Sequence, residues 1–173
     1  MTYRDFPRFD ETSAPAAARA ALAQNKQLFG AIVAPLARYA SSPLMLGTAL
    51  AGLAALEQSS LSALEREVLA MTMGRLNGCN FCVNLHRRLL AAQKADPELI
   101  RALEAGQPLA APRLEALRRF VLALLETKGD VQREVWTDFR EAGYTHEQAL
   151  EIVAGVGVYT MTTLANRLTE TSE

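Results

Sequence analysis

Capping and breaking residues divide this chain into segments of helical length. Two capping boxes, Ser62–Glu65 and Thr145–Gln148, mark helix starts. Pro43 suits the first turn of a helix, and Gly106 suits a helix end. Between these signals no stretch shows the alternation of a half-buried strand. Ala and Leu supply most of the hydrophobic residues and only 6% of the chain is aromatic, which also favours helices. We therefore predict an all-α fold.

The length of the chain suits one domain. Its 173 residues are enough to bury a real core. Residues 1–13 carry charges of both signs, so we predict a polar N-terminal arm without a fold of its own. Its aromatic residues Tyr3, Phe6 and Phe9 can dock the arm on the body or on a second subunit. We predict that residues 14–173 form a single helical domain, because the linkers between the expected helices are short and no composition shift marks a boundary.

Charge and the N-terminal sequence narrow the classes of partner. A net charge of −1 gives no electrostatic reason to expect nucleic acid or an anionic membrane. No apolar run reaches the roughly 18 residues that span a bilayer, and the start of the chain lacks the basic and apolar stretches of a signal peptide. We therefore expect a cytoplasmic protein, in which a C-x-x-C pair performs redox or metal chemistry rather than serving as a structural disulfide.

The reactive side chains gather in one short segment, EVLAMTMGRLNGCNFCVNLH. It holds both cysteines of the chain, Cys79 and Cys82, and one of its two histidines, His86. Glu67 lies at its start. Four chemically active side chains in so short a stretch make it the candidate site.

The expected helix break at Gly78 places the two thiols in the first turn of the next helix. Free backbone N–H groups and the positive end of the helix dipole stabilise a thiolate there and lower its pKa. The helical spacings put Cys79, Cys82 and His86 on one face. The two thiols can close a disulfide where the geometry permits it, and His86 can act as general base for Cys82.

Glu67 belongs to the preceding helix. Its helical neighbours are mostly apolar, so we expect the carboxylate to be at least partly buried and to need a partner. If the two helices fold back on each other, His86 is that partner. A relay from Glu67 through His86 would then move a proton off the Cys82 thiol.

The spacing Glu67-x11-Cys79-x2-Cys82-x3-His86 resembles the active-site signature of AhpD-like alkylhydroperoxidases, in the carboxymuconolactone decarboxylase superfamily. The flanking segments LSALEREVLAMTMGRLNGCNFCVNLH and GYTHEQALEIVAGVGVYTMTTLANRL resemble the core and the C-terminal helix of that family. The resemblance covers roughly residues 25–168.

The resemblance implies an all-helical peroxidase that works as a homo-oligomer. Cys82 would be the peroxidatic cysteine and Cys79 the resolving one, and Glu67 with His86 would form the proton relay. The partners would be a peroxide and an external dithiol reductant or reductase protein. The position before the second cysteine, a histidine in well-studied AhpD proteins, is Phe81 here, so one relay residue is absent. The decarboxylase branch lacks the C-x-x-C pair, which counts against that activity.

Other interpretations of the same residues stay open. The cysteines and His86 could bind a structural zinc with Glu67 as fourth ligand, although three ligands on one short helix make an awkward tetrahedral cage. The cysteines could be buried and inert, could serve a non-catalytic oligomeric protein as sensors, or could pass electrons to a separate peroxidase as an adapter. We predict no bound metal and no cofactor. The GVGV segment at 155–158 lacks the strand context of a nucleotide loop, and its small residues favour close helix packing.

The segment LMLGTALAGLAALEQ, residues 44–58, is apolar on nearly every side of its expected helix. Such a helix is either buried on most faces or packs against another subunit. It is more apolar than a small monomer easily covers, so we expect a homo-oligomer.

Overall fold

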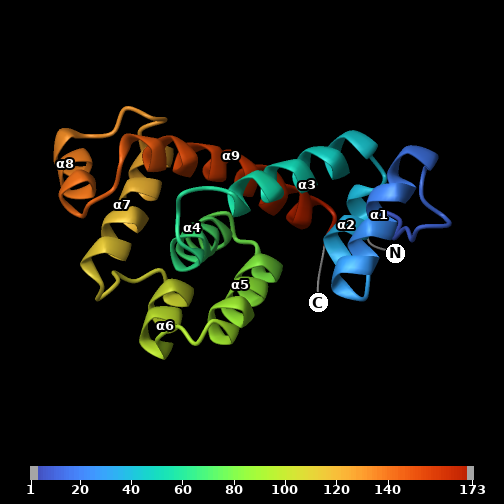
Figure 1. The fold of residues 1–173 in the computed structure, drawn as a ribbon, viewed down its shortest axis with the longest axis horizontal. Coiled ribbons are helices and arrows are strands. Elements are labelled where there is room, and N and C mark those ends of the chain that lie inside the picture. Colours follow the sequence, from blue (N-terminus) through green and yellow to red (C-terminus); the bar gives the residue numbers. More distant parts are fainter. Residues whose placement is uncertain (1–3, 171–173) are drawn as a thin grey trace.

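The computed structural model describes residues 4–170, so the ends of the predicted arm (1–3) and of the predicted domain (171–173) lie outside the described residues. Residues 4–170 form helices and no strand (Figure 1), which confirms the predicted all-α fold. In chain order the helices are α1 (Ala16–Phe29), α2 (Ala34–Tyr39), α3 (Pro43–Glu57), α4 (Ala63–Leu76), α5 (Asn80–Ala92), α6 (Pro97–Ala105), α7 (Pro112–Glu126), α8 (Arg133–Glu141) and α9 (His146–Leu168).

Both predicted capping boxes form, and they fix the starts of α4 and α9. The Glu65 N–H donates to Ser62 Oγ at 3.3 Å, and the Ser62 N–H donates to Glu65 Oε2 at 2.8 Å. Thr145 and Gln148 exchange the same pair of bonds at 3.1 and 3.0 Å. These bonds satisfy N–H groups that a helix start leaves without partners.

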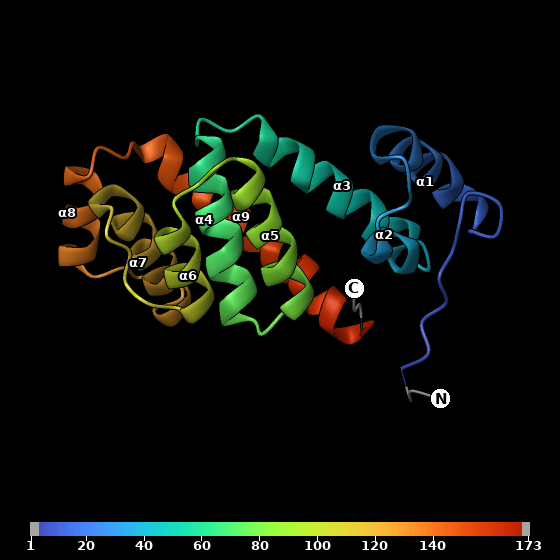
Figure 2. The same cartoon turned by 90° about the horizontal axis from the view of Figure 1, so that it is seen from below.

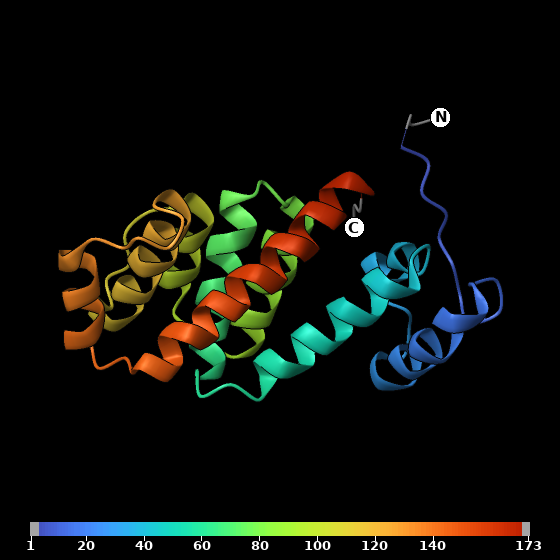
Figure 3. The ribbon, with the colours of Figure 1, turned by 90° about the horizontal axis from the view of Figure 1, so that it is seen from above.

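Two apolar clusters hold the helices together. The larger one joins α4, α7, α8 and the first half of α9 and contains Phe120, Phe139 and Leu69. The smaller one joins α1, α2 and α3, and the second half of α9 packs against it through Met161 and Ala165. Figures 2 and 3 show the consequence: α9 runs along the molecule with α4 and α5 on one face, and α3 beside it leads to α1 and α2.

Glycines let α9 approach its neighbours closely, as the GVGV segment predicts. A Cβ atom on Gly155 would lie 2.5 Å from Cδ2 of Leu69 in α4. On the other side, a Cβ atom on Gly52 of α3 would lie 2.8 Å from Cγ2 of Val158. Both separations are shorter than side-chain contacts allow. The absence of a side chain at Gly155 and Gly52 therefore lets α9 pack closely between α3 and α4.

Helix α3 is not buried on most faces by this chain. Only Leu46, Ala49 and Leu56 of α3 are buried, and Leu44 is 80% exposed. The first of the two expectations for this helix is therefore wrong for a single chain, while its packing against another subunit stays a prediction. Within residues 4–170, no helix combines the length and the apolarity needed to cross a membrane.

The start of the chain runs beside α2. The Phe9 N–H donates to the Ala37 carbonyl at 2.9 Å, and the Phe9 side chain is partly buried against the smaller cluster. Ala14, the first residue of the predicted domain, is buried. The boundary between arm and domain at residue 13 remains a prediction.

Candidate redox site

A sharp break separates α4 from α5 and brings the two helices face to face. Asn77 ends α4, and Gly78 adopts the left-handed conformation with φ of 63°, as predicted. Gly74 removes the side chain at the crossing: a Cβ atom there would lie 3.2 Å from Cβ of Cys82. The start of α5 can therefore lie directly against the last turn of α4.

Cys79 and Cys82 are joined by a disulfide, with Sγ atoms 2.12 Å and Cα atoms 5.3 Å apart. Cys79 caps α5, and its Sγ accepts a hydrogen bond from the Cys82 N–H at 3.2 Å. Both residues are buried, with 2% of Cys79 and 6% of Cys82 exposed. The C-x-x-C spacing therefore allows the disulfide that the sequence permits, and this disulfide is buried at the start of α5.

Glu67 and His86 form the pair that the sequence predicts. His86 Nδ1 lies 2.8 Å from Glu67 Oε2, and each side chain is 13% exposed. The Tyr159 ring from α9 makes a T-shaped contact with the His86 ring, with ring centroids 5.8 Å apart and planes at 86°. Burial, with the Glu67 charge adding to it, raises the pKa of Tyr159, which keeps its hydroxyl protonated. A carboxylate on one ring nitrogen orients the imidazole and leaves the other nitrogen for chemistry.

The predicted proton relay needs a contact between His86 and Cys82, and the disulfide form does not contain it. Within residues 4–170, no hydrogen bond joins His86 to either sulfur. The four candidate residues form two pairs, a disulfide at the start of α5 and a carboxylate–imidazole pair that joins α4 to α5. The transfer of a proton from Cys82 to His86 stays a prediction for the reduced form.

Two residues absent from the sequence-based candidates complete the surroundings of the sulfurs. Asn166 of α9 places its side-chain Nδ2 3.3 Å from Cys82 Sγ and 3.8 Å from Cys79 Sγ. The single hydroxyl hydrogen of Tyr39 in α2 is shared between two acceptors, Asn166 Oδ1 at 2.5 Å and the Thr162 carbonyl at 2.9 Å from the hydroxyl oxygen. In the sequence, Asn166 is only an amide near the end of a mostly apolar segment, and that position does not single it out as a functional residue.

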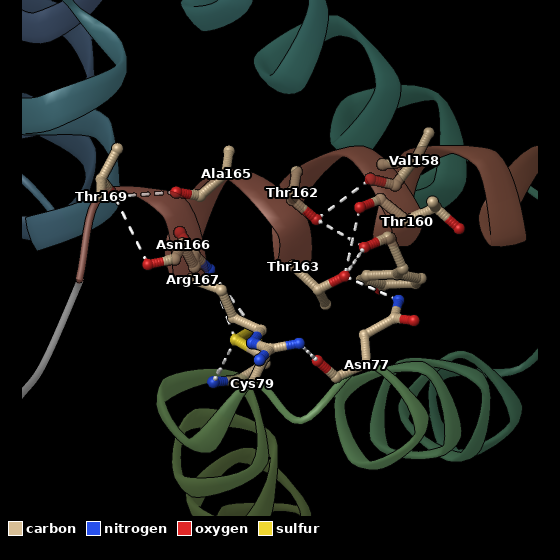
Figure 4. The surroundings of a disulfide bond; sticks show 12 residues. Asn77, Cys79, Val158, Thr160, Thr162, Thr163, Ala165, Asn166, Arg167 and Thr169 are labelled. Carbon is tan, nitrogen blue, oxygen red and sulfur yellow. Dashed lines mark hydrogen bonds between the residues drawn. A yellow bond between two sulfur atoms is a disulfide. The ribbon is translucent and has the colours of Figure 1, made fainter. Parts of the chain in front are cut away.

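Helix α9 is also tied to the break itself. The Asn77 side-chain Nδ2 donates to Thr163 Oγ1 at 2.8 Å, and Arg167 donates to the Asn77 carbonyl at 2.9 Å. Figure 4 shows Asn166 and Arg167 extending from α9 toward the start of α5. Three successive points on α9 therefore hold the segment that carries the disulfide.

Metal ligands do not gather here in the part of the chain that is described. No group of three His, Cys, Asp or Glu side chains in residues 4–170 is placed to hold a metal ion. Both thiols are consumed by the disulfide.

Comparison with known proteins places the fold. Residues 44–123 match the Carboxymuconolactone decarboxylase family. The crystal structure of an uncharacterized peroxidase-related protein from Ralstonia eutropha JMP134, named an alkylhydroperoxidase AhpD core, superposes with a TM-score of 0.80 at 20% identity, over 94% of this chain and 87% of that one. The chain therefore has an AhpD-like fold, and its residues 44–123 match the carboxymuconolactone decarboxylase family.

Two further solved structures share the fold. An uncharacterized peroxidase-related protein from Silicibacter sp. TM1040 aligns with a TM-score of 0.79 at 22% identity, over 97% of this chain and 89% of that one. A protein of unknown function from Agrobacterium tumefaciens aligns with a TM-score of 0.61 at 18% identity, over 73% and 87%. No curated protein sequence matches significantly. The family match covers α4 and α5 entirely but neither Tyr39 nor Asn166.

Proposed function

We propose that this protein is a thiol-dependent peroxidase that reduces a hydroperoxide with the Cys79–Cys82 pair. The observation that carries the proposal is the closed disulfide at the start of α5 with the Glu67–His86 pair beside it. The names of two similar structures, both peroxidase-related, support the same class of activity.

The proposed cycle balances with one peroxide and one external dithiol. The Cys82 thiolate attacks the outer oxygen of ROOH, the O–O bond breaks, and Cys82 becomes a sulfenic acid while the alkoxide takes a proton and leaves as ROH. The Cys79 thiol then attacks the sulfenic sulfur and releases water, which closes the disulfide. An external dithiol reopens it by two exchange steps and is itself oxidised to a disulfide.

In this proposal the Glu67–His86 pair handles the protons. His86 takes the proton from the Cys82 thiol and returns it to the departing alkoxide, and Glu67 holds the imidazole in orientation. The start of α5 favours the thiolate because its N–H groups and helix dipole face the sulfurs. Phe81 stands in the place of a further histidine, so one imidazole serves both proton transfers.

We also propose that the protein works as a homo-oligomer in the cytoplasm. The exposed large apolar side chains of α3 and α9, helices that lie side by side in Figure 3, support a second copy as the partner. They are Leu44, Leu150, Val153, Leu164 and Leu168. Light scattering on the purified protein tests this directly, and a monomer mass would contradict it.

The peroxidase proposal is tested with reduced protein and cumene hydroperoxide. We expect loss of one equivalent of peroxide per chain and formation of the Cys79–Cys82 disulfide, read by mass spectrometry. Cys82→Ser is expected to abolish the reaction, and Cys79→Ser to stop it at a Cys82 sulfenic acid that dimedone traps.

Two results would contradict the proposal. One is peroxide consumption by Cys82→Ser at the parent rate. The other is a reduced protein inert to peroxide whose disulfide still accepts electrons from a dithiol such as dihydrolipoamide, which would favour the adapter function instead.

A further inference from the structure

A buried amide points at the two sulfurs from outside the C-x-x-C helix. Asn166 is 6% exposed, and its Nδ2 donates to Cys82 Sγ at 3.3 Å. We propose that Asn166 is a further catalytic residue, whose amide donates to the Cys82 thiolate in the reduced protein, and that Tyr39 is a positioning residue that holds this amide. The inference rests on the proposed function and deepens it, since it assigns a hydrogen-bond donor to the same reacting sulfur.

The hydroxyl of Tyr39 fixes which end of the amide faces the sulfurs. The one hydroxyl hydrogen of Tyr39 is shared between two acceptors, and Asn166 Oδ1 at 2.5 Å is closer than the Thr162 carbonyl at 2.9 Å. The carbonyl end of the amide therefore points to α2, and its N–H end points to α5. Burial raises the pKa of Tyr39, which keeps its hydroxyl a donor. Tyr39 is 4% exposed. With both side chains enclosed, water does not compete for these bonds, and the amide is held in place before any charge forms on sulfur.

The strength of this contact depends on the oxidation state of the pair. A disulfide sulfur is a weak acceptor, whereas a thiolate accepts a charge-assisted hydrogen bond. The buried Asn166 amide therefore gains little in the oxidised form and much more in the reduced form. It should lower the pKa of the Cys82 thiol and shift the dithiol–disulfide equilibrium toward the dithiol.

The same donor serves the reopening of the disulfide. When an external thiolate attacks Cys79 Sγ, a new S–S bond forms there, the Cys79–Cys82 bond breaks, and its electron pair stays on Cys82 Sγ. The Asn166 N–H meets that charge as it develops, which makes Cys82 the better leaving group. The Cys79 sulfur has its own donor, the Cys82 N–H at 3.2 Å.

Other titratable and charged groups surround the pair without bonding to it. Within residues 4–170, the hydrogen bonds to the two sulfurs come from the Asn166 side chain and the Cys82 N–H alone. Arg167 is engaged with the Asn77 carbonyl. The groups that surround the pair are Tyr39 of α2, Glu67 of α4, His86 of α5, and Tyr159 and Arg167 of α9.

The test measures the Cys82 thiol without any peroxide. In a Cys79→Ser background, the pH dependence of Cys82 alkylation by iodoacetamide gives its pKa. We expect Asn166→Leu to raise that pKa by about 1 to 2, the range that loss of one hydrogen bond to a charged group implies. Tyr39→Phe should raise it by a smaller amount. Thr162→Val is the matched control, because its buried hydroxyl donates only to carbonyls of α9.

A second readout uses the intact cysteine pair. Asn166→Leu should shift the equilibrium with glutathione about tenfold toward the disulfide, at a pH above the thiol pKa. Asn166→Asp, nearly the same shape, places a carboxylate against the sulfur and should raise the thiol pKa further, which keeps the test available if Asn166→Leu does not fold. Folded Asn166→Leu or Asn166→Asp protein with the parent pKa would overturn the proposal. Both readouts stand apart from peroxide turnover, so a parent protein inert to peroxide refutes the peroxidase without touching this inference.

Discussion

The disulfide has two sides, and they are built in different ways. On the side of α4 and α5, Glu67 and His86 form a charged pair within a short stretch of chain that also contains both cysteines. On the side of α9 and α2, Asn166 and Tyr39 form a neutral pair drawn from the two ends of the chain, 127 positions apart. The Glu67–His86 pair can transfer protons. The Asn166–Tyr39 pair does not titrate in the same way and can only donate hydrogen bonds.

This difference suggests a division of labour. An imidazole held by a carboxylate changes its protonation state during a reaction. A buried amide held by a buried phenol does not, so it can stabilise charge without supplying or removing a proton. We therefore expect the Glu67–His86 pair to have the larger effect on the rate of reaction with peroxide. The Asn166–Tyr39 pair should mainly set the pKa of the Cys82 thiol before the reaction begins.

The largest expected effect comes from breaking the charged side. Removal of the imidazole in His86→Asn should lower the second-order rate of the reduced protein with cumene hydroperoxide by about 10² or more, the usual scale of general acid–base catalysis. Stopped-flow measurement of peroxide loss checks this. His146→Asn is the matched control, because this other histidine lies exposed beside Trp136 and far along the chain. If the two variants react equally fast, the side of α4 and α5 does not move the protons.

The second prediction tests the packing of α9 against α4, which positions Asn166 at the disulfide. Gly155→Val would drive a side chain into Leu69, which is fully buried in the larger cluster. Overpacking of this kind costs about 1–3 kcal/mol of folding free energy. Urea unfolding of the reduced protein measures it. Gly157→Val is the control, because nothing lies within 4 Å of a Cβ atom there. An equal loss in both variants would mean that α9 is not held against α4 by Gly155.

The sequence predicted the side of α4 and α5 because its determinants are local. The Ser62–Glu65 box fixes the start of α4, and Gly78 fixes its end. Once both are set, the helical repeat decides which side chains share a face, and Glu67 falls opposite His86. Predicting this pair needed only one assumption beyond the local signals, that α4 and α5 fold back on each other.

The other side could not be predicted in the same way. Nothing in the sequence around Asn166 distinguishes it from a surface amide, because its burial depends on which face of α9 turns toward α5. That rotation is set by tertiary contacts such as Gly155 against Leu69. Tyr39 depends in addition on how α2 packs beneath α9. The apolar segment of α3 shows the same limit, since its sequence indicates burial but not by what.

The third prediction concerns the pH dependence of folding stability, which should differ between the two capping boxes. Burial raises the pKa of Glu65, but its hydrogen bonds with Ser62, Tyr144 and Arg113 outweigh burial and leave the pKa below 4.5. A carboxyl with a depressed folded-state pKa adds stability that is fully present above 4.5 and is lost as the pH falls through the folded value. Glu65→Gln should therefore cost about 1–2 kcal/mol at pH 7 and progressively less below pH 4.

The box at α9 supplies the control for this experiment. Gln148 occupies the equivalent position and does not titrate. Gln148→Ala should lower stability by a similar amount that does not change between pH 7 and pH 3. Denaturant unfolding of both variants across that range distinguishes them. A pH-independent cost for Glu65→Gln would show that its charge plays no part in holding α4.

The smallest expected effect tests the outer face of α9. Gly157 lies in the middle of α9 on an exposed face, and no atom lies within 4 Å of a Cβ atom placed there. Gly157→Ala should stabilise a single chain by about 0.5–1 kcal/mol, because alanine loses less backbone entropy in a helix interior. Thermal unfolding at several protein concentrations measures the change. If the proposed oligomer packs on this face, the added methyl will instead lower the melting temperature, most strongly at high concentration where the oligomer is populated. The sign of one small substitution therefore reports whether α9, which presents Asn166 inward, presents its other face to water or to a second copy.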